Sequence, residues 1–368
     1  MGLLGLSGCG SPSSASVEMS SQTELVKTGS MELQYAENFA VDYYEDGYKM
    51  LTTLPDSKRY LLVPEGQPVP QGLDEDVSIL QEPLQNIYLV ASGVMDMFAS
   101  VDAVEQIRFS GQKQENWYIQ TAKDAMAAGD MIYAGKYSKP DYELLVSEGC
   151  DLAIENRMIT HSPEVVEMLQ SFDIPVMIEY SSYEQHPLGK VEWVKFFGAL
   201  TGKEAKAEEA FAEQTEILEE VESGEKTGKT IAFFYVTSNG LIQVRQSTDY
   251  IPKLIELAGG RYIFENLEDS GSGRSTLNMQ VEDFYAGAKD ADILIYNSSI
   301  DGGVTTVDEL IGKCNILKDF KAVQEGQVYC TTNDMYQQSM AVGYLLQAMH
   351  TVLTDDDTAK LRYLFLLQ

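Results

Sequence analysis

Aromatic and arginine side chains follow several segments whose composition is that of buried β-strands. The aromatic rings could pack against a flat or bulky molecule while tyrosine hydroxyl groups donate hydrogen bonds to it. Arg157 and Arg245 could form paired hydrogen bonds with carboxylate or phosphate groups. Two alternatives stay open, namely loop packing for the rings and surface ion pairs for the arginines. The aromatic candidates are Trp117, Tyr180, Tyr183, Tyr296 and Tyr336.

Two series of alternating strands and helices would bring these side chains together. Such alternation is typical of a parallel sheet with helices on both faces, and ligands of doubly wound sheets bind beyond the carboxyl ends of the strands. We therefore expect the loops after both series to line one cleft, which adds Ser92, Met95 and His186 to the candidates. The expected strands are 86–90, 107–110, 151–154 and 175–180 in the first series, and 230–236, 241–244, 262–264, 293–296 and 328–330 in the second.

A helical stretch over 187–223, interrupted at Thr201-Gly202-Lys203, lies between the two series. Its second part, Glu204 to Glu222, would span about 28 Å at 1.5 Å per residue, enough to join two lobes. The predicted fold class is therefore α/β, with two doubly wound Rossmann-like lobes joined by a single long α-helix. A meander of short strands from 31 to 63 precedes them. The expected regions are a leader remnant and tether at 1–30, an N-terminal lobe at 31–186, a linking helical segment at 187–225 and a C-terminal lobe at 226–368.

Composition excludes several functions. The 57 acidic residues outnumber the 26 lysines and arginines and leave a formal charge of -31, with no basic stripe, so nucleic acid is excluded as a partner. The four cysteines form no CxxC pair, which argues against a zinc site or a disulfide framework. P-loop, G-x-S-x-G and HExxH motifs are absent, and three histidines are too few to indicate a catalytic triad. We expect neither an enzyme nor a bound cofactor.

The first residues contain a candidate lipidation site. Leu6-Ser7-Gly8-Cys9 resembles a bacterial lipobox, in which a leader peptide is cut before a cysteine that receives lipid, and a Ser- and Gly-rich tether follows it. The alternative is a chance Gly-Cys pair beside a terminal tether. N-myristoylation does not fit, because that motif needs Ser or Thr where Leu6 stands. We expect Cys9 to anchor the protein on the outer face of the cell membrane.

Two matching segments carry a family resemblance. Lys139-Pro140-Asp141-Tyr142-Glu143-Leu144-Leu145 precedes the strand at 151–154, and Val281-Glu282-Asp283-Phe284 precedes the strand at 293–296. With the order of strands and helices from about Arg59 onward, they resemble the class III substrate-binding proteins of ABC importers, which include vitamin B12, ferric-siderophore and haem binders. In that family paired glutamates dock onto arginines of the two permease subunits. The resemblance places them at Glu143 and Glu282, whose ordinary alternative is a solvated glutamate at a helix start.

The resemblance implies a monomeric extracytoplasmic lipoprotein that delivers a siderophore-like iron complex to the permease dimer of an ABC importer. Corrinoid (vitamin B12) or haem binding, or solute sensing without transport, are the alternatives. His186 could be an axial ligand to a haem or cobalt centre, or a hydrogen-bonded loop histidine. Capture of a bare metal ion fits poorly, since the chain has only His161, His186 and His350, so no protein metal site is expected.

Overall fold

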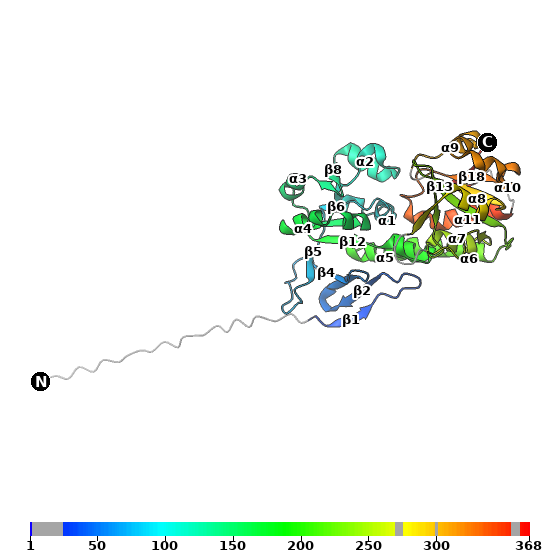
Figure 1. Cartoon of the computed structure of the whole chain (residues 1–368). Helices are drawn as coiled ribbons and strands as arrows, with labels where there is room; N and C mark the ends of the chain where they lie inside the picture. Colours follow the sequence, from blue (N-terminus) through cyan, green and yellow to red (C-terminus); the bar gives the residue numbers. More distant parts are fainter. Residues whose placement is uncertain (2–24, 269–274, 299–300, 355–360) are drawn as a thin grey trace.

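Three large β-sheets and one two-stranded sheet organise the part of the chain that the computed structural model describes, namely Met1 and residues 25–268, 275–298, 301–354 and 361–368. The lipobox, Cys9 and the predicted tether up to residue 24 lie outside these residues. Residues 27–30, predicted as the end of the tether, instead form the first strand of a sheet. Figure 1 shows two α/β lobes side by side, with the first sheet below the N-terminal lobe. Within the described residues, no helix combines the length and the apolar character needed to cross a membrane.

The first sheet is a five-stranded meander in the order β1-β2-β3-β4-β5. Neighbouring strands are antiparallel except β4 and β5, which are parallel. The strands predicted between residues 39 and 63 are confirmed, and β1 and β5 were missed. Leu33 to Tyr35, also predicted as a strand, lies outside the sheet and contains a bend. The strands are β1 (Lys27–Ser30), β2 (Phe39–Tyr44), β3 (Lys49–Thr53), β4 (Lys58–Val63) and β5 (Val77–Gln81).

The N-terminal lobe contains the predicted parallel sheet, in the order β12-β11-β6-β7-β8. Its apolar strands are buried on both faces because helices cover them. The strands are β6 (Ile87–Leu89), β7 (Ile107–Ser110), β8 (Ile132–Tyr133), β11 (Leu152–Asn156) and β12 (Val176–Glu179), with a small hairpin of β9 (Gly135–Lys136) and β10 (Lys139–Pro140). The helices are α1 (Val94–Ser100), α2 (Gln120–Ala128), α3 (Tyr142–Ser147) and α4 (Pro163–Ser171).

The C-terminal lobe has a mixed sheet, which corrects the expectation that it repeats the parallel pattern. β13, β15, β17 and β18 are parallel, but β14, β16 and β19 run antiparallel to their neighbours. A tight turn, in which Thr237 O accepts from Gly240 N at 2.9 Å, leads β13 directly back into β14. So short a connection cannot make a parallel crossover. The strands are β13 (Thr230–Val236), β14 (Ile242–Arg245), β15 (Arg261–Tyr262), β16 (Thr276–Met279), β17 (Ile293–Tyr296), β18 (Val328–Thr331) and β19 (Leu364–Leu366).

Helices of this lobe follow the predicted positions in part. The sequence of residues 335–350 predicts a helix, but the helix begins only at Val342, because residues 332–341 form a loop with a short 3-10 turn. The helices are α7 (Tyr250–Leu257), α8 (Val281–Ala288), α9 (Val307–Lys313), α10 (Lys321–Gln324) and α11 (Val342–Thr354).

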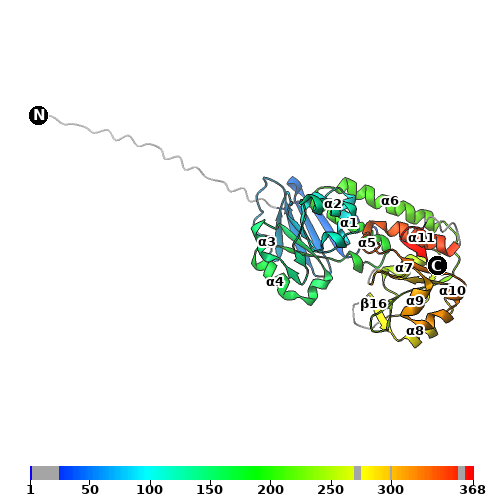
Figure 2. The ribbon, with the colours of Figure 1, turned by 90° about the horizontal axis from the view of Figure 1, so that it is seen from above.

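Two helices link the lobes, α5 (Pro187–Thr201) and α6 (Glu204–Glu222), and the bounds of α6 are those predicted. They meet at Gly202, whose φ of +68° ends α5 in the left-handed conformation. Near its start α6 contacts the end of α1 through an ion pair between Lys206 and Asp102. Farther along, it contacts α11, where Gln214 Oε1 accepts a hydrogen bond from Gly343 N at 2.9 Å. The helix therefore crosses from one lobe to the other, as Figure 2 shows.

Helix α5 is buried along its whole length although it carries charged side chains. Glu192 is fully buried and accepts hydrogen bonds from the backbone N–H groups of Gln34, Tyr35 and Ala36 at 2.8 to 3.1 Å. Its carboxylate also lies 3.4 Å from Lys195 Nζ. The segment before β2 is thereby fixed to α5.

We predict that Glu192→Gln lowers the free energy of unfolding by about 3 kcal/mol, because it leaves Lys195 and three backbone amides without their buried counter-charge. Urea denaturation measures the change. Glu208→Gln is the matched control, since Glu208 pairs with the same Lys195 at 3.0 Å but is exposed. Equal losses in the two variants would contradict the role given to Glu192.

Candidate functional site

A pocket of about 220 Å³ lies where β6, β11 and β12 end, and we name it the cleft pocket. Three of its walls come from the N-terminal lobe, because parallel strands place their carboxyl ends at the same edge of a sheet. Lys190 of α5 and two residues of the loop after β18 complete it. The lining residues are Ala91, Ser92, Gly93, Asn156, Arg157, Met158, Glu179, Ser181, Ser182, Tyr183, Lys190, Tyr336 and Ser339.

The end of β11 positions Arg157. Asn156 caps the following 3-10 turn, since its side-chain oxygen accepts a hydrogen bond from Met158 N at 2.9 Å. The Arg157 guanidinium carbon lies 4.6 Å from the centre of the Tyr183 ring, within the range of a cation–π contact. The pocket thus presents a cation beside an exposed aromatic ring.

Two buried charged residues lie at the base of the cleft pocket. Glu179 ends β12, and its carboxylate accepts hydrogen bonds from Ser181 N at 2.9 Å and Ser181 Oγ at 2.6 Å. Burial raises the pKa of Glu179, while the hydrogen bonds from Ser181 and the positive charge of Lys190 act to lower it. Lys190 Nζ lies 4.8 Å from the centre of the Tyr250 ring, which joins the pocket to the first turn of α7.

Some predicted ligand-binding residues come together in this pocket. Ser92, Arg157, Tyr183 and Tyr336 line it. Tyr180 is buried beside it, with its ring centre 6.4 Å from that of Tyr183.

Four other predicted residues lie outside the cleft pocket. Met95 is fully buried in the core, and the Trp117 indole donates to Ser110 Oγ at 3.1 Å. Tyr296 is fully buried and its hydroxyl donates to Asp301 at 2.9 Å. Arg245 pairs with Asp249 at 3.4 Å, so the surface ion pair considered for it is a largely buried one. The polar groups of Trp117, Tyr296 and Arg245 thus each have a hydrogen-bond or ion-pair partner within the protein.

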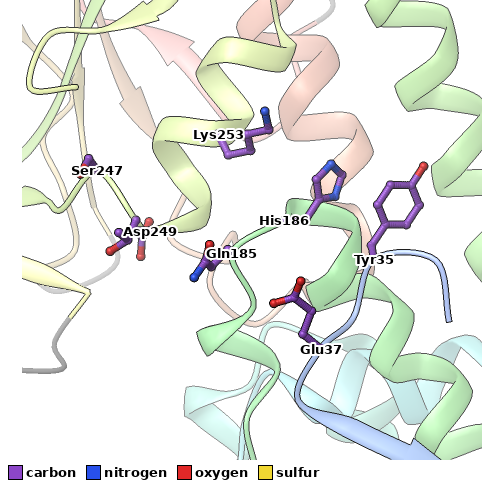
Figure 3. Close-up of a pocket in the computed structure, with 8 residues that line it drawn as sticks. Tyr35, Glu37, Gln185, His186, Ser247, Asp249 and Lys253 are labelled. Carbon is purple, nitrogen blue, oxygen red and sulfur yellow. The ribbon is translucent and has the colours of Figure 1, made fainter. Parts of the chain in front are cut away.

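His186 lines a different cavity, of about 370 Å³, which we name the hinge pocket because it lies at the start of α5 (Figure 3). Its Nδ1 accepts a hydrogen bond from Leu188 N at 3.2 Å and so caps α5, and its ring stacks on Tyr35 with 4.4 Å between centres. Burial lowers the pKa of His186, which favours the neutral imidazole needed for this cap. This hydrogen bond is what the second of the two alternatives expects, and ligand binding by His186 stays a prediction. The other lining residues are Glu37, Gln185, Ser247, Thr248, Asp249 and Lys253.

Lys190 and Glu179 line the pocket but were not predicted from the sequence. Lys190, like Glu192 and Lys195, interrupts the apolar residues of α5, and a charge at such a position was the signal that could have revealed it. Within the described part of the chain, no group of three or more His, Cys, Asp or Glu side chains is arranged to hold a metal ion.

The two proposed docking glutamates are exposed in different lobes. Glu143 lies in the first turn of α3, which Asp141 caps by accepting from Leu144 N at 3.1 Å, and Glu282 lies in the first turn of α8. Both carboxylates are thus accessible to a partner.

Glu155 is a buried carboxylate in β11, two residues before Arg157. Within the described residues, neither of its side-chain oxygens has a hydrogen-bond partner. Burial raises its pKa to about 8, so the folded protein holds it protonated at neutral pH.

Comparison with known proteins identifies relatives of the chain. The model of a family described as periplasmic binding protein matches residues 98–335. An uncharacterized lipoprotein of Methanocaldococcus jannaschii is 25% identical over 336 residues, which cover 83% of this chain and 77% of that protein. A second uncharacterized lipoprotein of that organism is 24% identical over 322 residues, covering 84% and 79%.

Solved structures share the fold at low identity. A possible iron-binding, periplasmic solute-binding protein from Staphylococcus epidermidis superposes with a TM-score of 0.57 at 16% identity, covering 73% of this chain and 98% of that one. The periplasmic heme binding protein HutB of Vibrio cholerae gives 0.57 at 14% identity, with the same coverages.

We predict that the stability of the protein falls as pH rises from about 4.5 to about 8, in part because the unfolded chain ionises Glu155 there while the folded chain does not. Between these pH values the contribution of Glu155 to the free energy of unfolding decreases by up to about 1.4 kcal/mol per pH unit. Glu155→Gln should remove it, so the variant gains stability relative to the parent as pH rises. Urea denaturation of both proteins at several pH values tests this, and parallel curves would refute it.

Proposed function

Because the chain belongs to the periplasmic binding protein family, we propose that it is an extracytoplasmic lipoprotein that captures a siderophore-like ferric complex and delivers it to an ABC importer. Family and fold are those of substrate-binding proteins rather than enzymes. In this proposal residues 31–186 and 226–368 form the two lobes, 187–225 link them, and the protein acts as a monomer.

The cleft pocket is the observation that carries the proposal. Arg157 and Lys190 supply positive charge there, and Tyr183 and Tyr336 supply exposed ring surface. This combination suits an anionic chelate with flat faces, whose own oxygen atoms hold the iron. Solved structures with this fold include a Fe3+-hydroxamate transport protein and heme binding proteins, which supports an iron-bearing ligand.

Haem bound through His186 is less well supported. Because Nδ1 of His186 accepts a hydrogen bond from Leu188 N, the neutral ring carries its proton on Nε2, so neither nitrogen has a free lone pair for a metal. The side chain also lines the hinge pocket instead of the cleft pocket. Corrinoid binding and haem binding through other contacts stay as alternatives. The absorbance spectrum of protein purified from its own cells distinguishes them, because a corrin, a haem and a ferric catecholate absorb differently.

Attachment to the membrane is proposed through lipid on Cys9. The relatives named as lipoproteins support this, together with the Leu6-Ser7-Gly8-Cys9 sequence. The proposed partner on the membrane is the permease dimer of the importer, which Glu143 and Glu282 would contact from the two lobes.

We predict that Arg157→Met weakens binding of a ferric tris(catecholate) complex about tenfold, a loss of ~1.4 kcal/mol, because the cation beside Tyr183 is removed. Quenching of tryptophan fluorescence on titration with the complex measures the affinity. Arg59→Met is the control, since Arg59 pairs with Asp74 and Asp76 in the meander. Unchanged affinity in Arg157→Met would exclude the cleft pocket as the site.

A second prediction concerns docking. Replacing both Glu143 and Glu282 by Ala should abolish uptake of radioactive iron complex by cells and leave the affinity of the isolated protein unchanged, because exposed carboxylates steer association. The control replaces Glu164 and Asp283, which are also exposed in the first turns of helices. Uptake at the parent level in the first double variant would show that these glutamates do not dock.

A further inference from the structure

The loop between β18 and α11, residues 332–341, belongs to the C-terminal lobe but is bonded to the N-terminal one. Gln337 is fully buried at its centre. Its side-chain oxygen accepts a hydrogen bond from Tyr118 N at 2.8 Å, and its side-chain nitrogen donates to Asn116 O at 2.8 Å and Tyr336 Oη at 3.0 Å. One amide group therefore joins residues that lie more than two hundred positions apart in the chain.

A second attachment lies at the start of α1. Asp96 Oδ2 accepts a hydrogen bond from Met340 N at 2.7 Å. Ser339 packs so closely on Gly93 that a Cβ atom at that position would lie 2.8 Å from Ser339 Oγ. The loop is thus fixed to the N-terminal lobe at two places, Gln337 and Ser339–Met340, which lie directly beside or at its two pocket-lining residues.

The same loop forms one wall of the cleft pocket. Tyr336 and Ser339 line the pocket, and the Tyr336 ring meets the Tyr118 ring edge to face with 6.2 Å between centres. Gln337 binds the backbone N–H of Tyr118 and the hydroxyl of Tyr336, so it sets the relative position of both rings. If the loop left the N-terminal lobe, this wall would leave the pocket.

We infer that Gln337 is a positioning residue that latches loop 332–341 across the cleft pocket, and that the ligand enters and leaves when this latch opens. The inference rests on the proposed function of the cleft pocket as the ligand site. When loop 332–341 leaves the N-terminal lobe, the buried Gln337 amide loses its hydrogen bonds to Tyr118 and Asn116 at once. The open form is therefore a minor population in the free protein. Access to the pocket is then limited by the latch.

Gln337→Met tests the latch, since methionine has a similar length and no amide group. Gln338→Met is the matched control, because Gln338 bonds Asp334 at 3.0 Å and Tyr363 at 3.0 Å, both in the C-terminal lobe. Hydrogen exchange of the free protein should show the Tyr118 amide exchanging at least tenfold faster in Gln337→Met and at the parent rate in Gln338→Met. Amides of β13 report global stability and should be unchanged in both variants.

A second variant, Asp96→Ala, removes the other attachment and should also speed exchange at Tyr118. Stopped-flow binding of a ferric tris(catecholate) complex completes the test: association and dissociation should both become faster in Gln337→Met, which loss of stability alone would not produce. An unchanged Tyr118 amide, or equal changes in the two glutamine variants, would overturn the latch. The exchange measurement needs no ligand, so a failure of the latch is distinct from a failure of the proposed function, which would appear as absent binding to the parent protein.

Discussion

The charged side chains of the completely buried helix α5 must be paired, and this requirement constrains the whole structure. Each charged side chain of α5 needs a partner, because an unpaired charge in the interior costs several kcal/mol. Glu192 accepts hydrogen bonds from backbone amides of the segment before β2. Lys195 forms an ion pair with Glu208 of α6, and Lys190 makes a cation–π contact with Tyr250 of α7. The meander, the linking helix and the C-terminal lobe are therefore all positioned by one helix.

This arrangement also sets the electrostatics of the cleft pocket. The protein carries a formal charge of -31, yet Arg157 and Lys190 both line one pocket. A concave site with buried walls concentrates the field of the charges within it, so a local positive region can persist inside an acidic molecule. The acidic exterior provides solubility, whereas the proposed recognition of an anionic ligand would depend on these two side chains.

The sequence predicted the elements better than the site. The bounds of α6 and β13 were predicted correctly, because apolar periodicity and strand composition are local signals. Trp117 and Tyr296 were expected in the pocket from their positions near strand ends, but the Trp117 indole donates to the buried Ser110 hydroxyl and the Tyr296 hydroxyl donates to Asp301. The direction of a side chain and the identity of its partner are tertiary properties, which a single sequence does not reveal. For the same reason loop 332–341 was in part assigned to a helix, although Gln337 holds it against the other lobe.

The way in which a ligand reaches the pocket follows from which contacts can break most easily. Swinging the lobes apart would disturb α5, which packs on α1 in one lobe and on α7 and α11 in the other and has no exposed residue. Releasing loop 332–341 breaks a few hydrogen bonds and removes Met335 and Met340 from the core, but it does not require α5 or α6 to bend. Since bending or unpacking a buried helix disrupts far more contacts than moving a loop, local opening at the pocket wall is the motion of lower cost. Helices α5 and α6 therefore hold the two lobes in place relative to each other, and loop 332–341 is the part that moves.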